Sequence, residues 1–254
     1  FNYDSIAGCD NGSCCFISGC TDLFSNNYNA DACFDDGSCS YAYASCFSIA
    51  NEDQLSETVI GTTTYDLQTN YSVQNRILVH EDGTISAAWT MSEELNYGWF
   101  DRGTGYNYFD GNSWGVNPNS RLESTRCGWP SILTTGSGKE IVIAHNTDNS
   151  YMQMTHRSSK GVGPFSEQII SSLDSAGFYR YLIWNRSAVG GIDNKTIHMV
   201  AVTSPDYLGG SLFNGLDGAL LYYRSQDEGV TWDIQEMQLP GMDSTMHYGM
   251  FGDS

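Results

Sequence analysis

The stretch from Ser225 to Trp232 constrains the fold of this chain most strongly. It has the form S-x-D-x-G-x-T-W, and the segments on either side, 218–224 and 233–239, have the composition of β-strands. Asp and Ser side chains accept hydrogen bonds from nearby backbone N–H groups, and glycine takes the positive φ that a tight turn requires. We therefore predict a hairpin, with Gly229 in the turn and Trp232 beside it as an apolar anchor.

This octet resembles the Asp-box, or BNR repeat, of sialidase-like β-propellers, where it joins the two outer strands of a blade. All the specified positions match, namely Ser225, Asp227, Gly229, Thr231 and Trp232. In that family the box is structural and lies away from the catalytic face, so the resemblance implies a fold rather than an activity. The alternative is an ordinary hairpin with an acidic turn.

The rest of the chain from residue 58 onward reads as strands separated by Gly, Asn, Asp and Ser clusters, without sustained helical periodicity. A strand–turn–strand plan begins near residues 76, 129 and 181, and a more polar hairpin follows each time. Units of roughly 50 to 65 residues suit four-stranded blades. We predict a mainly β fold, a β-propeller of four-stranded blades with three to four blades present. A jelly roll or a paired sandwich is the alternative architecture.

The propeller is expected to cover residues 58–254 and to be incomplete at its C-terminus. Residues 247–254 stand where a fourth unit would open, and a propeller needs about four or more blades to close its ring. In the first unit Asp110, Gly111 and Trp114 match part of the octet. They predict a degenerate Asp-box there.

Seven of the eight cysteines lie between residues 9 and 46. This density indicates a disulfide framework and an oxidising compartment. Zinc is the alternative, although the sequence has no C-x-x-C pair. Residues 2–14 also align without gaps on residues 27–39, which is an internal repeat. We interpret residues 1–46 as a small disulfide-rich module and residues 47–57 as a linker.

The repeat resembles the G-C-T-D…N-Y…D-D-G-S-C repeats of bacterial secreted proteins, which are grouped with thrombospondin type 3 calcium-binding repeats. The first copy lacks the Gly-Cys-Thr-Asp opening, so we expect the polypeptide to begin before Phe1. The resemblance implies a Cys20–Cys39 disulfide and bound Ca²⁺, an ion that prefers carboxylate and amide oxygens. The candidate ligands are Asp22, Asn27, Asp31, Asp35 and Asp36. The alternative is that these residues only form turns.

Charge limits the partners of this protein. The chain has 11 Lys and Arg residues against 30 Asp and Glu, a net charge of −19. Nucleic-acid binding requires a basic surface, so we exclude that partner. No apolar run has the length of a membrane span, and the few lysines argue against contact with an anionic membrane. We expect a secreted or cell-surface protein.

One arginine suggests carbohydrate chemistry. Arg76, at the start of the first unit, resembles the arginine that opens sialidase domains and clamps the substrate carboxylate with two others, although Leu78 replaces the usual proline. A planar guanidinium suits a carboxylate well. The companions expected by unit position are Arg126 and either Arg180 or Arg186. Such an enzyme also needs a Tyr nucleophile, a Glu and an acid/base Asp, which the sequence does not single out.

Aromatic loop residues favour binding. Trp99, Tyr106 and Trp114 lie among Asp, Asn, Arg and Gly residues, a combination that suits sugar rings or a protein partner. The alternative is packing between blades, which we expect for Trp89 and Trp232. Short D-S/T-hydrophobic motifs resemble the O-glycosylation motif of bacteria with type IX secretion. The serines of these motifs are Ser5, Ser175 and Ser244.

These observations lead to one hypothesis and two alternatives. The hypothesis is a non-catalytic adhesion protein that presents a β-propeller to a glycan or a protein at the cell surface. The first alternative is a sialidase-type glycoside hydrolase, for which three arginines should converge in one cavity. The second is a structural subunit of an extracellular assembly that contacts other copies of itself.

Overall fold

The computed structural model describes residues 17–40, 57–68, 74–148, 151–171, 173 and 177–247. The chain divides into two compact units, Phe1–Thr58 and Val59–Ser254, so the division falls one residue after the predicted start of the β domain. No helix in these described ranges is long and apolar enough to cross a membrane. Several predictions fall outside them, namely those on the first repeat copy, on residues 47–56 of the linker, on Ser5 and Ser175, and on residues 248–254.

The described part of the first unit is held by disulfides rather than by a core. β1 (Ser18–Gly19) and β2 (Phe34–Asp35) pair in parallel. A disulfide joins Cys20 to Cys39, the pairing that the repeat implies, and Cys33 is also disulfide-bonded. Among residues 17–40, Cys20 is the only buried hydrophobic residue. A module with so little buried apolar surface depends on its covalent bridges.

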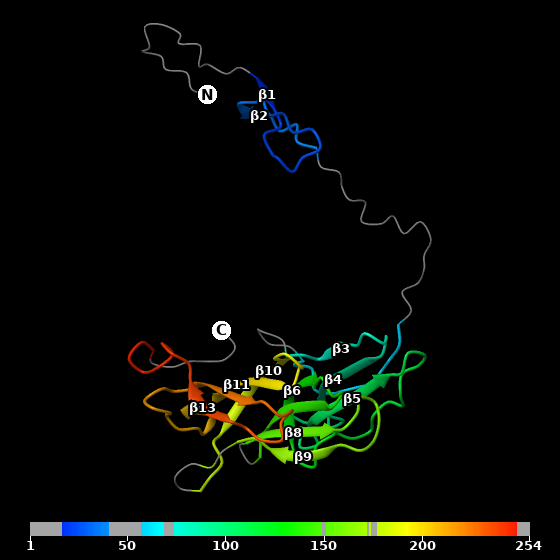
Figure 1. The fold of residues 1–254 in the computed structure, drawn as a ribbon, viewed down its shortest axis with the longest axis vertical. Helices are drawn as coiled ribbons and strands as arrows, with labels where there is room; N and C mark the ends of the chain where they lie inside the picture. Colours follow the sequence, from blue (N-terminus) through cyan, green and yellow to red (C-terminus); the bar gives the residue numbers. More distant parts are fainter. Residues whose placement is uncertain are drawn as a thin grey trace. The chain divides into compact units, whose positions relative to one another are not determined.

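Three antiparallel sheets follow one another along the second unit (Figure 1), and in each sheet the strands lie side by side in chain order. The first sheet consists of β3 (Ile77–Val79), β4 (Ile85–Met91) and β5 (Gly103–Phe109). The second consists of β6 (Cys127–Thr134), β7 (Glu140–Asn146), β8 (Met152–Arg157) and β9 (Ser166–Ile169). The third consists of β10 (Leu182–Gly190), β11 (Thr196–Thr203), β12 (Leu220–Ser225) and β13 (Ile234–Gln238).

The predicted fold class is confirmed, since the second and third sheets are four-stranded meanders of the kind that form propeller blades. The first sheet differs and has three strands in the part of the chain that the structure describes. After β5 the chain makes only an isolated bridge between Phe109 and Trp114. The following segment, 115–120, contains Gly115, Pro118 and two asparagines. Proline has no N–H to donate to a strand ladder, so this composition opposes a fourth strand.

The main apolar core lies between the second and third sheets. Its largest fully buried side chains include Ile141, Met154, Leu182 and Tyr223. Trp232 packs against this core, as predicted for the anchor of the hairpin. The apolar cluster between the first and second sheets is smaller, and its buried members are Ala88, Ile132 and Val142.

A buried ion pair reinforces the contact between the first two sheets. The Glu140 side chain is fully buried and accepts hydrogen bonds from Arg157 Nε at 2.7 Å and from the Tyr106 hydroxyl at 3.0 Å. The Ser86 hydroxyl donates to the same carboxylate, and the Arg157 guanidinium lies 4.4 Å from the centre of the Phe165 ring. A buried carboxylate is tolerated only with such partners. Tyr106 therefore makes structural contacts here, and the binding role predicted for it stays a prediction.

The Asp-box-like octet forms the turn between β12 and β13. The Gly229 N–H donates to Ser225 Oγ at 2.8 Å, and Gly229 has a φ of +81°, as predicted. Asp227 accepts hydrogen bonds from both the N–H and the hydroxyl of Thr231, at 2.8 and 2.6 Å. Glu228 in turn accepts a hydrogen bond of 2.7 Å from the Ser137 hydroxyl in the β6–β7 turn. The octet thus closes its hairpin and also joins the third sheet to the second.

The two ends of the sheets differ in their connections. One end, the turn end, carries the short turns β3–β4, β6–β7, β8–β9, β10–β11 and β12–β13, and Lys160–Asp82, with 2.7 Å between the charged atoms, joins the first two sheets there. The other end, the loop end, carries the connections β4–β5, β7–β8, β9–β10 and β11–β12, the last with the 3₁₀ helix η1 (Asp206–Leu208). At the loop end the rings of Tyr151 and Tyr179 meet at 5.3 Å.

Candidate functional site

A cavity of about 390 Å³ lies on the flank of the first sheet. We call it the Arg76 cavity. Its lining residues come from the segment that precedes the sheet, from the start of β3 and from β4. They are Ile60, Gly61, Thr62, Thr63, Gln68, Arg76, Ile77, Ala87, Ala88 and Trp89. The cavity therefore combines one guanidinium, one indole ring, two hydroxyls and an amide.

Hydrogen bonds to β4 fix the outer wall of this cavity. The Thr63 hydroxyl and the Gln68 amide both donate to the Thr90 carbonyl, at 3.0 and 2.7 Å. Gly61 must be a glycine, because a Cβ at this position would lie 2.0 Å from the Trp89 ring. Trp89 thus packs tightly against Gly61 and against Gly105 of its own sheet, and it also presents part of its ring to the cavity; packing between blades stays a prediction.

Arg76 is the charged residue of this cavity. Its Nε and Nη1 atoms are buried and have no hydrogen-bond partner within the described residues. Nη2 makes long contacts to the Gln68 carbonyl at 3.3 Å and to Gln74 Oε1 at 3.5 Å. Burial, with a smaller effect from the positive charge of Arg186, lowers the pKa of Arg76 to about 10. The group stays cationic at neutral pH, so the cavity favours an anionic ligand.

The other two arginines of the predicted clamp have different surroundings. Arg180 forms an ion pair with Glu236 at 3.0 Å and lies over the Phe213 ring at 4.9 Å. Arg126 holds a loop, as described below, and neither residue lines the Arg76 cavity. Among the described residues, therefore, the three arginines do not form one site.

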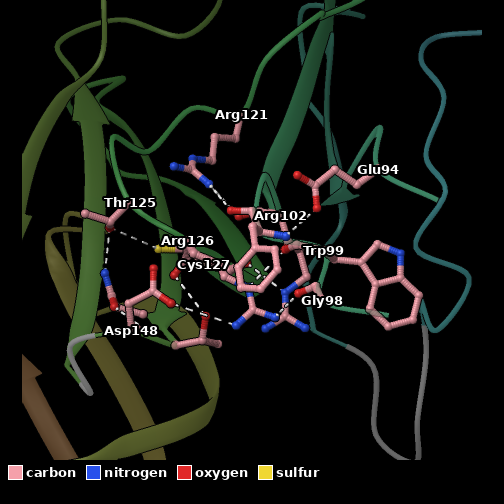
Figure 2. A network of polar contacts seen from close by, with 12 residues as sticks. Glu94, Gly98, Trp99, Arg102, Arg121, Thr125, Arg126, Cys127 and Asp148 are labelled. Carbon is pink, nitrogen blue, oxygen red and sulfur yellow. Dashed lines mark hydrogen bonds and ion pairs between the residues drawn. The ribbon is translucent and has the colours of Figure 1, made fainter. Parts of the chain in front are cut away.

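Arg126 and Arg121 hold the β4–β5 connection, residues 92–102, at the loop end (Figure 2). Arg126 Nε donates to the Trp99 carbonyl at 2.9 Å, and its Nη1 lies 3.8 Å from Asp148. Arg121 Nη1 donates to the Phe100 carbonyl at 3.1 Å. We call this connection the arginine-held loop. Guanidinium N–H groups donate to its backbone carbonyls, and these charge-assisted hydrogen bonds restrain the loop.

Carboxylates inside the loop complete the restraint. Glu94 accepts the Phe100 N–H at 2.8 Å, and Asp101 accepts the Glu93 N–H at 2.6 Å and the Ser92 hydroxyl. Despite these bonds, the loop exposes large apolar side chains, with Tyr97 95% exposed and Phe100 70% exposed. A restrained loop with exposed aromatic rings is typical of a binding surface.

Two titratable residues near this loop, His145 and Cys127, are buried in uncharged form. His145 is 4% exposed, and burial together with Arg102 and Arg126 lowers its pKa to about 3. Cys127 is a buried free cysteine, and burial raises the pKa of its thiol. A neutral thiol is a poor nucleophile, so we assign Cys127 no catalytic role.

Two more cavities open at the loop end. One of about 430 Å³ lies beside the arginine-held loop and is lined by Phe100 and by polar residues that include Glu93, Asn119, Ser120 and Arg121. A smaller one of about 120 Å³ is lined by two tyrosines, Arg180 and small polar residues of the third sheet. Both combine aromatic rings with hydrogen-bonding side chains.

The aromatic residues predicted to bind lie in three different places. Trp99 packs edge-on against Tyr65 at 5.2 Å, and its Nε1 is buried. Trp114 packs on Phe109 at 5.6 Å. Tyr106 contacts Glu140 between the sheets. Two of the rings that the structure exposes, Tyr97 and Phe100, are neighbours of Trp99 in sequence, and their position between acidic and amide residues was the available signal.

The predicted calcium ligands act as turn formers in the structure. Asp22, Asp35 and Asp36 each accept the N–H of the residue two positions on, at 2.9, 2.9 and 3.0 Å. Asn27 bonds the backbone of Ser40 at 2.7 Å. Within the described ranges, no three His, Cys, Asp or Glu side chains gather as metal ligands do. Calcium binding, with Asp31 as a further ligand, stays a prediction that calorimetric titration with Ca²⁺ can check.

The proposed modification of Ser244 also stays a prediction. Ser244 is exposed, and its neighbour Asp243 accepts a hydrogen bond of 2.9 Å from the Thr245 N–H. The serine is thus reachable from solvent at the surface of the third sheet's final segment. Mass spectrometry of native peptides would detect a glycan on it.

Comparison with known proteins gives structural likeness only. No family model matches the chain, and no curated protein matches its sequence. Solved structures that match include a protein of unknown function from Dyadobacter fermentans (9% identity, TM-score 0.45), a glycosyl hydrolase from Bacteroides ovatus (12%, 0.43) and a GH43_1 enzyme from Xanthomonas citri complexed with xylotriose (14%, 0.38). The matches cover 78, 69 and 72% of this chain and 53, 51 and 58% of those chains. The chain thus spans about half the length of these structures, and the likeness concerns the fold alone.

Proposed function

We propose that this protein is a non-catalytic glycan-binding protein of the cell surface, which holds one acidic sugar unit in the Arg76 cavity. The observation that carries the proposal is Arg76 itself, a largely buried cation that lines a cavity and whose Nε and Nη1 atoms have no hydrogen-bond partner among the described residues. The disulfide-bonded first unit supports export to an oxidising compartment.

The chemistry of the cavity fits such a ligand. A guanidinium donates two parallel hydrogen bonds to a carboxylate, and the indole face of Trp89 suits the apolar face of a sugar ring. The Thr62 and Thr63 hydroxyls and the Gln68 amide line the same space and suit sugar hydroxyls. A volume of about 390 Å³ lies within the range of small-molecule sites.

Binding without hydrolysis is favoured over the sialidase alternative. Most glycosidases use a pair of carboxyl groups on either side of the scissile bond. Of the described residues, those that line the Arg76 cavity include no Asp, Glu or His. The sugar would therefore be held by hydrogen bonds and stacking, with no acid or base beside it.

The test measures both retention and sugar release on sialylated, uronic-acid and neutral glycans, with and without calcium. We expect retention of acidic oligosaccharides without release. Arg76→Ala should weaken this retention at least tenfold, since a charge-assisted bidentate contact is lost. The control is Arg224→Ala, because Arg224 pairs with Asp233 on the surface of the third sheet, far in sequence from the cavity.

Two results would overturn the proposal. Release of sialic acid that Arg76→Ala abolishes would make the protein a sialidase-type hydrolase. Failure to retain any acidic glycan would favour the structural-subunit alternative, in which contacts with protein, including other copies of this chain, replace sugar binding.

A further inference from the structure

The exposed aromatic rings of the second unit are confined to one end of the sheets. Within the described residues they are Tyr97, Phe100, Phe178, Tyr179 and Tyr207. All five belong to the loop end, in the β4–β5, β9–β10 and β11–β12 connections. The exposed large apolar side chains in the hairpin turns of the turn end are aliphatic, namely Val162, Ile192 and Val230. Exposed aromatic rings cost free energy in water, so their restriction to one end indicates contact with a ligand.

Phe100 is presented as a fixed platform. Its N–H is bonded to Glu94 and its carbonyl to Arg121, at 2.8 and 3.1 Å. The Arg126 guanidinium lies 5.8 Å from the centre of its ring. The ring is nevertheless 70% exposed. A ring held in this way loses little conformational entropy when a ligand stacks on it.

Polar cavities accompany the aromatic rings. The cavity of about 430 Å³ beside Phe100 has the side chains of Glu93, Asn119 and Ser120 in its lining. The cavity of about 120 Å³ beside Tyr179 has Thr203, Ser204 and Ser211. Hydroxyl, amide and carboxylate groups next to an aromatic ring match the alternation of hydroxyls and C–H faces on a sugar.

The chemistry of the loop end selects among ligand classes. A protein interface has a continuous apolar core, whereas these rings stand on three separate connections with polar lining residues beside them. The net charge of −19 opposes a polyanion. A neutral polymer of sugars satisfies both conditions.

We propose that the loop end binds an uncharged stretch of polysaccharide, with Phe100 and Tyr179 as stacking platforms at two positions along the chain. This inference rests on the proposed function in taking the ligand to be a glycan. It adds that the ligand is a polymer and that most of its sugar units carry no charge. The Arg76 cavity would hold an acidic unit of the same glycan.

The experiment uses the full chain in affinity electrophoresis against hydroxyethylcellulose, galactomannan and xylan, with neutral oligosaccharides of increasing length as competitors. We expect retardation by at least one polymer and competition that strengthens with oligosaccharide length. Phe100→Ala and Tyr179→Ala should each weaken retention roughly tenfold, as at binding hot spots. Phe100→Trp and Tyr179→Trp keep a ring and should restore it, which separates stacking from a folding defect.

The matched control is Phe24→Ala, which removes an aromatic ring that is 90% exposed on the first unit and should leave retention unchanged. The inference is overturned if no neutral polymer retards the protein, or if the alanine variants bind like the wild type. In either case binding of acidic oligosaccharides that depends on Arg76 would leave the proposed function standing. Retention on neutral polymers without any Arg76-dependent binding would support this inference and overturn the proposed function of the Arg76 cavity.

Discussion

At the scale of single residues, His145 shows how burial fixes a charge state. It lies on β7 beneath the arginine-held loop, 4% exposed, with Nδ1 lacking a partner among the described atoms. Burial and the neighbouring Arg102 and Arg126 keep its pKa near 3 in the folded protein. In the unfolded chain a histidine titrates near about 6.5. Between these two pKa values the unfolded state binds a proton at His145 and the folded state does not.

This difference predicts acid sensitivity with a defined sign. The folded pKa is the lower one, so the stability that neutral His145 contributes is present above pH 6.5 and is lost as the pH falls toward 3. We expect a loss of unfolding free energy that approaches about 1.4 kcal/mol per pH unit from this group. Urea unfolding of the wild type and of His145→Gln from pH 7 to 4 checks this. The wild type should lose more stability, while His247→Gln, an exposed site, should follow the wild type. Parallel curves for wild type and His145→Gln would contradict the prediction.

At the same scale, sequence could identify residues but not their meeting points. The contacts of Ser225, Asp227, Gly229 and Thr231 are local, so the octet alone predicts its turn. The surroundings of Arg76, by contrast, include Gln68 and Trp89, whose positions depend on how the first sheet folds. Unit position cannot place three arginines from three sheets around one ligand.

At the scale of elements, the strands of the three sheets in the second unit were predictable because apolar residues fall in the strands and polar residues in the turns. The absence of a fourth strand from the described part of the first sheet was not predictable. Asp110 accepts hydrogen bonds from the N–H groups of Asn112 and Ser113 at 2.8 Å, and the chain then leaves the sheet. The arginine-held loop was also not predictable, since its shape depends on side chains 20 or more residues away, such as Arg126.

The arginine-held loop gives a prediction at this scale. Arg126→Ala removes the donors to the Trp99 and Gly98 carbonyls, so the loop should open more often. We expect amide hydrogen exchange in residues 97–102 to rise about tenfold, which corresponds to about 1.4 kcal/mol of lost local stability. Exchange in β11 and β12, which belong to the third sheet, serves as the internal reference. Unchanged exchange in the loop would show that Arg126 does not hold it.

At the scale of the whole molecule, the two units rely on different forces. The first unit has disulfides and little core, whereas in the second unit Cys127 is the only cysteine and it is free. The cysteine count alone predicted this division. What it could not predict was which side chains of the second unit are left exposed at the loop end.

Reduction should therefore affect the units separately. With dithiothreitol we expect the first unit to lose its protection from proteolysis, since the Cys20–Cys39 loop opens. The thermal midpoint of the second unit should stay within about 2 °C, because no disulfide restrains its unfolded chain. Limited proteolysis with mass spectrometry and calorimetry measure the two effects. A large fall in the main calorimetric transition on reduction would contradict this division.

The Glu140–Arg157 ion pair of the second sheet, with its hydroxyl donors from the first, also bears on the order of events during synthesis. Each sheet is made from one continuous stretch of chain, so its strands can pair soon after that stretch leaves the ribosome. Ser86 and Tyr106, which solvate Glu140, belong to the earlier sheet, while Arg157 follows Glu140 by 17 residues. The hydroxyl donors of Glu140 are therefore synthesised before it, and Arg157, which carries the opposite charge, is synthesised one strand after it. Burial of the Glu140 carboxylate therefore does not depend on residues that are synthesised much later.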